Sequence, residues 1–175
     1  WHRMRPGYLH DPMQTALRKQ PSFPVRFLAT CAFTGNLPGA PGTYGALLAL
    51  GLYALLLRFL PGWILAAVIV LCSVLGAAVS QRMEAVLGDD PACVNIDEMA
   101  GMWLALWVIP VDAWWWWIVA FGLFRFFDIV KPGPVYTVQR LGRGWGVMLD
   151  DLLAGAAVNV LLQLFAIGLH VWRGV

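Results

Sequence analysis

The fold is decided by residues 44–79, which read YGALLALGLYALLLRFL, then PG, then WILAAVIVLCSVLGAAV. Each apolar arm has close to the ~20 residues that an α-helix needs to cross a bilayer. The first arm, Tyr44–Leu60, is interrupted only by glycines and Arg58, and Pro61-Gly62 is a turn signal. This stretch predicts a helical hairpin inside a membrane.

Three further apolar runs follow, at Met99–Ile109, Ala113–Phe127 and Leu152–Leu169. The first two are short for a full span, so we expect each helix to continue into its polar flank, the Met99 helix starting near Pro91. Since no strand-like alternation persists, we predict an all-α fold, a small polytopic membrane bundle of about four to five membrane-embedded helices. A polar N-terminal tail is expected over residues 1–25, and one membrane domain over residues 26–175.

The composition also favours a membrane protein. Of the 175 residues, 60% are hydrophobic and 13% are charged, whereas a soluble domain has about 25% charged residues. Ten tryptophans are present, and we expect the Trp114–Trp117 run to anchor the outer membrane interface. The net charge of +2, with no basic stripe, argues against a nucleic-acid partner. The three widely spaced cysteines are expected to be small buried hydrophobes rather than disulfide or zinc ligands.

The basic residues near the N-terminus place that end in the cytoplasm by the positive-inside rule. Alternation then puts the turns at Pro61 and Pro110 outside and the segments 80–98 and 128–151 inside. Seven acidic residues are thereby gathered at the cytoplasmic face, namely Asp89, Asp90, Asp97, Glu98, Asp128, Asp150 and Asp151. Crowded carboxylates repel one another unless a cation neutralises them, and oxygen ligands favour a hard cation such as Mg²⁺.

A Gly/Pro-rich loop, TGNLPGAPGTYG at residues 34–45, leads directly into the first apolar run. Free N–H groups at such a junction can hold a phosphate, which makes Thr34, Asn36, Gly42 and Thr43 candidate substrate-binding residues. The alternative is a plain turn in which Thr43 caps the helix.

Three other clusters carry charged groups next to apolar helices. Asp97-Glu98 can contact one metal site from two sides, or can simply be acids that favour a helix start. Arg125 and Asp128 share a helical face, and with Lys131 they form a cation–anion–cation line that suits a phosphate bridged to a metal, or else an interfacial ion pair. Asp150-Asp151 follow a Gly-rich loop at an expected helix start, where acids also favour the helix dipole.

Several phosphatase classes lack their sequence signatures here. The three histidines lie at the chain ends, no Cys precedes an Arg at phosphatase-loop spacing, and neither D-x-D-x-T nor a P-loop occurs. Metal-assisted attack of water on a phosphomonoester is the simplest remaining chemistry.

With these motifs in place, the chain resembles the phosphatidylglycerophosphatase A family. The resemblance rests on three blocks in the same order: GNLPGAPGTYG (35–45), IDEMAGMW (96–103) and the long segment from Phe124 to Gly155. It implies an integral membrane protein of the bacterial inner membrane that uses Mg²⁺ to hydrolyse phosphatidylglycerophosphate to phosphatidylglycerol, in the synthesis of phosphatidylglycerol and cardiolipin. The matching acidic positions are Asp97, Glu98, Asp128, Asp150 and Asp151, and the matching basic positions are Arg125, Lys131 and Arg140.

On this hypothesis, Asp97, Glu98, Asp150 and Asp151 bind the metal, and one of them activates water. Arg125 and Lys131 hold the phosphate of a phospholipid substrate that stays in the bilayer, and Asp128 orients Arg125 or binds metal. Two rival functions are a phosphotransferase of the CDP-alcohol type and a non-enzymatic transporter or scaffold that binds cations. The first lacks its D-G-x-x-A-R core, because Leu152-Leu153 follow Asp151.

Overall fold

The fold is entirely helical over the part of the chain that this computed structural model describes, residues 20–109, 114–130 and 144–173. These residues form six α-helices, two short 3₁₀ turns and no strand. The α-helices are α2 (Phe23–Ala29), α3 (Pro41–Leu55), α4 (Gly62–Leu87), α5 (Ile96–Ala105), α6 (Trp115–Val130) and α8 (Trp145–Arg173). The all-α prediction is confirmed.

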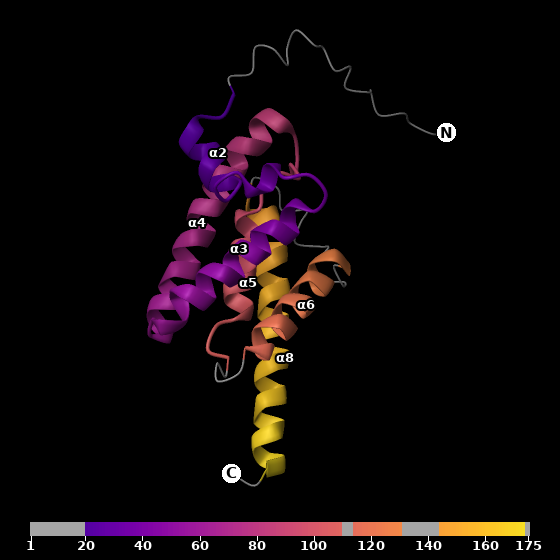
Figure 1. Cartoon of the computed structure of the whole chain (residues 1–175). Coiled ribbons are helices and arrows are strands. Elements are labelled where there is room, and N and C mark those ends of the chain that lie inside the picture. Colours follow the sequence, from indigo (N-terminus) through magenta and orange to yellow (C-terminus); the bar gives the residue numbers. More distant parts are fainter. Residues whose placement is uncertain (1–19, 110–113, 131–143, 174–175) are drawn as a thin grey trace, which may run out of the picture.

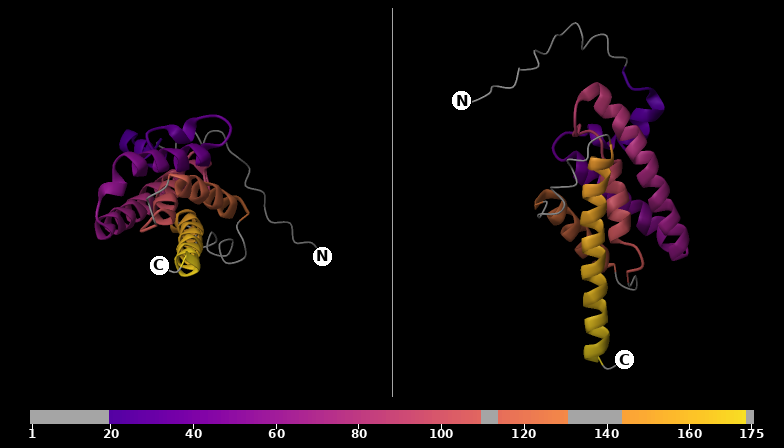
Figure 2. Two further views of the ribbon diagram at one scale, coloured as in Figure 1. Left: turned by 60° about the horizontal axis from the view of Figure 1, so that its bottom comes forward. Right: turned by 180° about the vertical axis from the view of Figure 1, so that it is seen from behind.

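Two of these helices are long and apolar enough to cross a membrane, which is fewer than the predicted four to five. They are α4, with 26 residues, and Trp145–Trp172 of α8, with 28 residues. The third apolar run continues into its polar flank as expected, since α5 begins at Ile96, but it ends at Ala105. Its ten residues span only about 15 Å at 1.5 Å per residue, too short to cross a bilayer. Figures 1 and 2 show α8 running through the body of the molecule and projecting beyond it at its C-terminal end.

Helix ends differ from the sequence prediction in several places. The expected start near Pro91 is wrong, because α5 begins at Ile96 after Asn95. The polar residues after Val79 continue α4 as far as Leu87. The helix that carries Asp150 begins earlier than expected, at Trp145, so the two aspartates lie in its second turn and not at its start. The short helix α2 was not predicted, and the expected boundary between residues 25 and 26 falls inside it.

The short helix α5 lies at the centre of the bundle, between α8, α3 and α4. Its backbone approaches α8 so closely that a Cβ on Gly155 would lie 2.2 Å from the carbonyl oxygen of Gly101. Phe124 of α6 and Met148 of α8 are fully buried beside it. This packing fixes the first turn of α5 against the N-terminal half of α8.

Asn95, which precedes α5 and is fully buried, ties the Gly/Pro-rich loop to this centre. Its side-chain Nδ2 donates to Thr34 Oγ1 (3.1 Å) and to the carbonyl oxygen of Pro41 (3.3 Å). Its backbone N–H donates to the carbonyl oxygen of Ala29. The start of α3 is therefore held next to the start of α5.

The tryptophan run divides between the surface and the core. Trp114 and Trp115 are exposed, whereas Trp116 is buried and stacks on Trp115 with ring centroids 4.4 Å apart. Trp117 packs edge-on against Tyr53. The first two rings of this run are thus the most exposed and the best placed to anchor an interface.

Candidate active site

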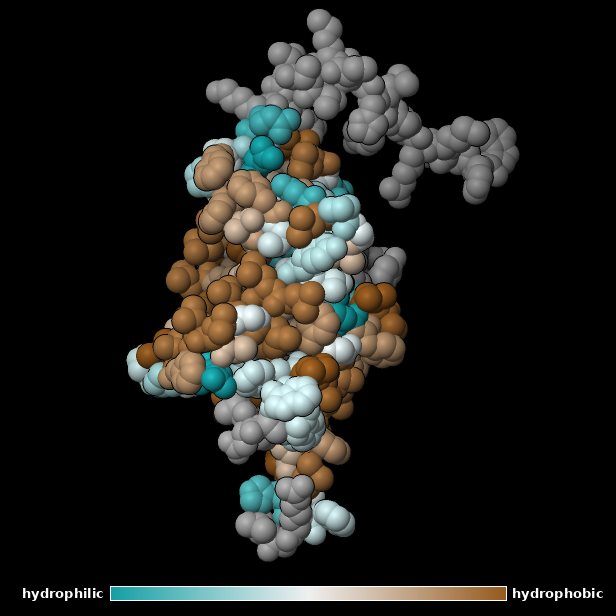
Figure 3. Space-filling model, viewed as in Figure 1, coloured by the Kyte–Doolittle hydropathy of each residue, from teal (hydrophilic) through white to brown (hydrophobic). Residues whose placement is uncertain are grey.

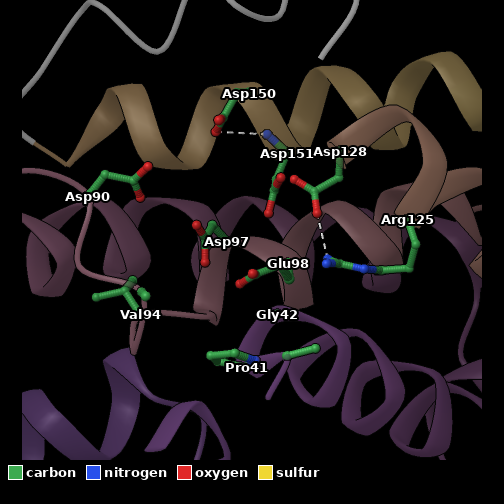
Figure 4. A pocket seen from close by; sticks show the side chains of 12 residues that line it. Pro41, Gly42, Asp90, Val94, Asp97, Glu98, Arg125, Asp128, Asp150 and Asp151 are labelled. Carbon is green, nitrogen blue, oxygen red and sulfur yellow. Dashed lines mark hydrogen bonds and ion pairs between the residues drawn. The ribbon is translucent and has the colours of Figure 1, made fainter. Parts of the chain in front are cut away.

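A cavity of about 250 Å³ lies where the first turns of α3 and α5 meet α6 and α8. Figure 4 shows the carboxylates of Asp97, Glu98, Asp128 and Asp151 directed toward one another across it. The lining residues are Ala40, Pro41, Gly42, Asp90, Ala92, Val94, Asp97, Glu98, Arg125, Asp128, Asp150 and Asp151. Segments 96–101 and 149–155 carry the four predicted metal ligands, so the metal-site hypothesis requires them to meet. They lie side by side here.

Three of these acids are close enough to share one ion. Oxygen atoms of Asp97, Glu98 and Asp151 all lie within 4.8 Å of one another. Oδ1 of Asp97 and Oε2 of Glu98 are buried and have no hydrogen-bond partner among the described residues. Buried carboxylate oxygens without partners are costly, so this donor set fits a hard divalent cation.

The pKa values of the two α5 acids also favour a bound cation. Burial, and then the negative charge of Asp151, raises the pKa of Glu98 to about 8. Burial, and then the charge of Glu98, raises the pKa of Asp97 well above its ordinary value. A cation at this place would supply the opposite charge that both groups lack, and it would favour their ionised forms.

One cation of the protein itself lies at the edge of the cluster. Arg125 of α6 forms an ion pair with Asp128, one turn further along the same helix, at 2.5 Å. The Nε of Arg125 is buried and has no partner among the described residues. The guanidinium can therefore accept an additional anionic ligand while Asp128 keeps it in place.

Gly42, in the first turn of α3, brings the loop into contact with the acids. A Cβ at this position would lie 2.1 Å from Oε1 of Glu98 and 3.1 Å from Nη1 of Arg125. Any larger residue would therefore displace the two charged groups, so glycine is needed for this close approach.

Of the remaining predicted site residues, some line the cavity and others do not. Asp150 lines the cavity, and its Oδ1 accepts the backbone N–H of Asp151 at 3.1 Å, but it is not in the close group of three. Thr34 accepts from Asn95 and donates to the carbonyl oxygen of Cys31. Thr34, Asn36 and Thr43 are not among the residues that line the cavity. The alternative in which Thr43 caps the helix is wrong, because α3 begins after Ala40.

Two predicted basic residues, Lys131 and Arg140, lie outside the described residues. In the other direction, the structure adds Asp90 to the cavity wall. The sequence counted Asp90 among the acids of this face but gave no reason to choose it, because its place depends on the turn around Pro91 that brings residues 90–94 over the pocket.

The comparisons with known proteins agree with the motifs. The sequence profile of the phosphatidylglycerophosphatase A family matches residues 27–166. A Bacteroides thetaiotaomicron protein named "Putative phosphatidylinositol-3-phosphatase" is 41% identical over 150 residues, which cover 82% of this chain and 94% of that protein. No solved structure matches the chain.

Two relatives carry the family's own name. The protein named "Phosphatidylglycerophosphatase A" of Haemophilus influenzae is 38% identical over 146 residues, covering 82% of this chain and 88% of that one. The protein of the same name from Escherichia coli is 33% identical over 140 residues, covering 79% and 81%. The chain belongs to the phosphatidylglycerophosphatase A family.

Proposed function

We propose that this protein is a Mg²⁺-dependent lipid phosphatase that hydrolyses phosphatidylglycerophosphate to phosphatidylglycerol and inorganic phosphate. The observation that carries the proposal is the group of three carboxylates within 4.8 Å beside a half-buried arginine, in a chain of this family. A phosphomonoester needs positive charge around its oxygens, and a carboxylate group alone would repel it.

Asp97, Glu98 and Asp151 would hold the cation, and Asp150, which lines the same cavity, would support them. When bound, Mg²⁺ would supply the positive charge that offsets the carboxylates and the phosphate and that favours attack by water. Binding would also give Asp97 Oδ1 and Glu98 Oε2 the partner that they lack among the described residues.

The side chains of the protein would then position the phosphate. Arg125 would bind one phosphate oxygen through its guanidinium, while Asp128 keeps the arginine oriented. The first turn of α3, which approaches Arg125 at Gly42, would close over the head group. Thr34, Asn36 and Thr43, which do not line the cavity, and Lys131 and Arg140, which lie outside the described residues, keep substrate contacts only as an expectation from the resemblance.

The reaction is a simple hydrolysis. Water bonds to phosphorus, the bond between phosphorus and the glycerol oxygen breaks, and the alcohol leaves with a proton. A carboxylate of the cluster would take a proton from the attacking water and pass it to the leaving glycerol oxygen. The cavity is close to the membrane-crossing helices, so the lipid can keep its tails in the bilayer while its phosphate reaches the site.

The membrane setting belongs to the same proposal. Helices α4 and α8 would cross the inner membrane of a bacterium, and α3, α5 and α6 would be embedded beside them, forming a multi-pass domain over residues 26–175. The acidic cavity would face the cytoplasm, where residues 1–25 form a polar tail. The product would enter the synthesis of phosphatidylglycerol and cardiolipin.

The relatives named above leave two head groups to compare, because one of them is named for a phosphoinositide and two for phosphatidylglycerophosphate. The test is phosphate release by the purified protein from phosphatidylglycerophosphate, phosphatidylinositol 3-phosphate and phosphatidic acid, each with Mg²⁺ and with a chelator. We expect phosphatidylglycerophosphate to be the best substrate and the chelator to abolish release. A clear preference for the phosphoinositide would overturn the assignment of the substrate.

Asp97→Asn tests the role of the cluster. Because this change removes a charged oxygen from the centre of the site, we expect kcat/KM to fall by roughly a hundredfold or more. Asp89→Asn is the matched control, since Asp89 is exposed and does not line the cavity. Full activity of Asp97→Asn, with normal expression, would remove Asp97 from the mechanism.

A further inference from the structure

A second cavity lies on the opposite side of α5 from the acids. It has a volume of about 490 Å³, within the range of roughly 300–1,000 Å³ found for ligand pockets. Ile96, Met99 and Trp103 of α5 form its floor, at positions three and four residues apart that share one helical face. The adjacent positions 97 and 98 face the acidic cavity, so one helix separates the two cavities.

The walls of this apolar groove come from three other segments. Helix α4 contributes Val68, Leu71, Cys72 and Leu75, again on one face, and α3 contributes Leu48 and Leu52. Phe27, Leu28, Cys31 and Ala32, from α2 and the turn after it, close the end nearest the acids. The groove thus runs for about 10 Å along α4, which is two turns of helix.

The lining offers nothing to a polar ligand. All lining residues are apolar, and the one indole N–H, of Trp103, already donates to the carbonyl oxygen of Ala49 at 3.0 Å. The thiol of Cys31 lies 3.4 Å from the carbonyl oxygen of Asn95 and donates to it. Only a hydrocarbon would gain free energy by entering such a groove.

The surroundings identify the source of that hydrocarbon. The wall residues of α4 fall within one of the two helices that are long and apolar enough to cross a membrane, so in the proposed topology the groove lies at the depth of lipid chains. Figure 3 shows apolar side chains covering the face of the molecule formed by α3 and α4. Leu71 and Leu75, which line the groove, are exposed, so its mouth is itself apolar.

One end of the groove lies close to the acidic cavity. Cys31, at this end, contacts Asn95 and Met99, and Asn95 is followed directly by Ile96 and Asp97. A lipid whose phosphate occupies the acidic cavity therefore has the apolar groove one helix away for a tail.

We infer that the groove between α2, α3, α4 and α5 binds one acyl chain of the phospholipid substrate while its phosphate is held at the acidic cavity. This inference rests on the proposed phosphatase function. It adds a specificity for the lipid tail to a site that otherwise recognises only a head group.

The test compares long-chain phosphatidylglycerophosphate with its water-soluble dihexanoyl analogue. Cys72→Phe places a ring in the groove, and Leu71→Trp narrows its mouth in case the first variant folds poorly. Since each buried methylene strengthens binding about fourfold, displacing two of them is expected to raise KM for the long-chain lipid about 15-fold. KM for the dihexanoyl lipid and kcat for both should change less than twofold.

Val70→Phe is the matched control, because Val70 lies on the same helix, is exposed and does not line the groove. It should leave both substrates unaffected. Equal losses for long and short lipids in both groove variants would overturn the inference, as would unchanged kinetics for the long-chain lipid.

A second measurement does not depend on phosphatase activity. Phosphatidylglycerol with a diazirine near the end of its acyl chain is cross-linked to the full chain in detergent, and the labelled residues are mapped by mass spectrometry. We expect saturable labelling at Leu52, Val68 and Trp103 that Cys72→Phe removes. Labelling confined to exposed positions such as Val70 and Val74 would contradict the acyl-chain site. Labelling in the groove without any hydrolysis of the substrate would refute the proposed phosphatase function alone.

Discussion

At the scale of single residues, the neighbours of Glu98 show which charges meet at the site. Its carboxylate lies beside Asp97 and Asp151 on one side and Gly42 and Arg125 on the other. Arg125 is already paired with Asp128, so among the described residues the negative charges of the group of three are not fully neutralised. Protons or a bound cation can supply the remaining positive charge, and the balance between the two can be measured.

This balance predicts how stability depends on pH. The pKa of Glu98 is raised from 4.5 to about 8, so between these values the folded state binds more protons than the unfolded state. Without a divalent cation, stability must therefore fall as pH rises through this window. In chelator we expect Tm to be lower at pH 8.5 than at pH 6 by about 5 °C or more.

Thermal unfolding in detergent checks this prediction. Saturating Mg²⁺ should raise Tm most at pH 8.5, because bound metal replaces the protons. Glu98→Gln should reduce both the pH dependence and the response to Mg²⁺. A melting curve in chelator that is independent of pH would contradict the charge balance described here.

Gly42→Ala tests the close approach of α3 to the site. The added methyl group would lie 2.1 Å from Oε1 of Glu98, which is the end of a flexible side chain. The carboxylate can swing away at little cost to the fold, so we expect kcat/KM to fall about tenfold or more while Tm changes by only a few degrees.

Gly51→Ala serves as the comparison for this change. It lies in the same helix, and a Cβ there would meet nothing within 4 Å. Its effect should be slightly stabilising, by about 0.5–1 kcal/mol, since alanine is a better helix former than glycine. Equal activity of the two variants would show that the geometry at Gly42 is not needed for function.

At the scale of helices, the site depends on how α5 packs on α8. The two acids of α5 and Asp151 of α8 meet because Gly101 and Gly155 let the two backbones approach closely. A Cβ on Gly101 would lie 2.6 Å from the carbonyl oxygen of Asp151. In contrast with Gly42, the obstacles here are backbone atoms, which cannot move without shifting a helix.

Gly155→Ala should therefore move the two helices apart. The added methyl group would lie 2.2 Å from the carbonyl oxygen of Gly101, and overpacking of this kind costs about 1–3 kcal/mol. We expect a lower Tm, and a loss of activity that persists at a temperature where the variant is fully folded. Gly168→Ala, in the same helix with nothing within 4 Å, should leave activity unchanged and should not lower Tm. A similar loss of Tm and of activity in both variants would refute the argument.

At the scale of the whole molecule, the apolar runs were enough to predict an all-helical chain, because hydrophobic segments of this length have few other structures available. The same runs located the segments of α3, α4, α6 and α8 to within several residues. The sequence also predicted that Asp97, Glu98 and Asp151 would lie on one side of the bundle, and they meet in one cavity.

Helix ends and long-range contacts were not predictable. Polar residues after Val79 can continue a helix as easily as end it, so the reach of α4 to Leu87 depends on its packing. The start of α5 at Ile96 depends on Asn95, whose partners lie 54 and 61 residues away in sequence. One of those partners is Thr34, which the sequence had suggested as a substrate-binding residue.

The two long helices lead to a prediction of membrane topology. The end of α4 and the start of α8 lie on the same side, because the backbone N–H of Gly144 donates to Oε2 of Glu84 at 2.8 Å. If both helices cross the membrane, the acidic cavity and Asp89 share one side, and Trp63 and the C-terminal end of α8 share the other. Trp63→Cys should then react with an impermeant maleimide in intact cells, and Asp89→Cys only after lysis. The two variants are compared in a chain whose three native cysteines are changed to serine, and labelling of both residues from the same side would show that α4 does not cross.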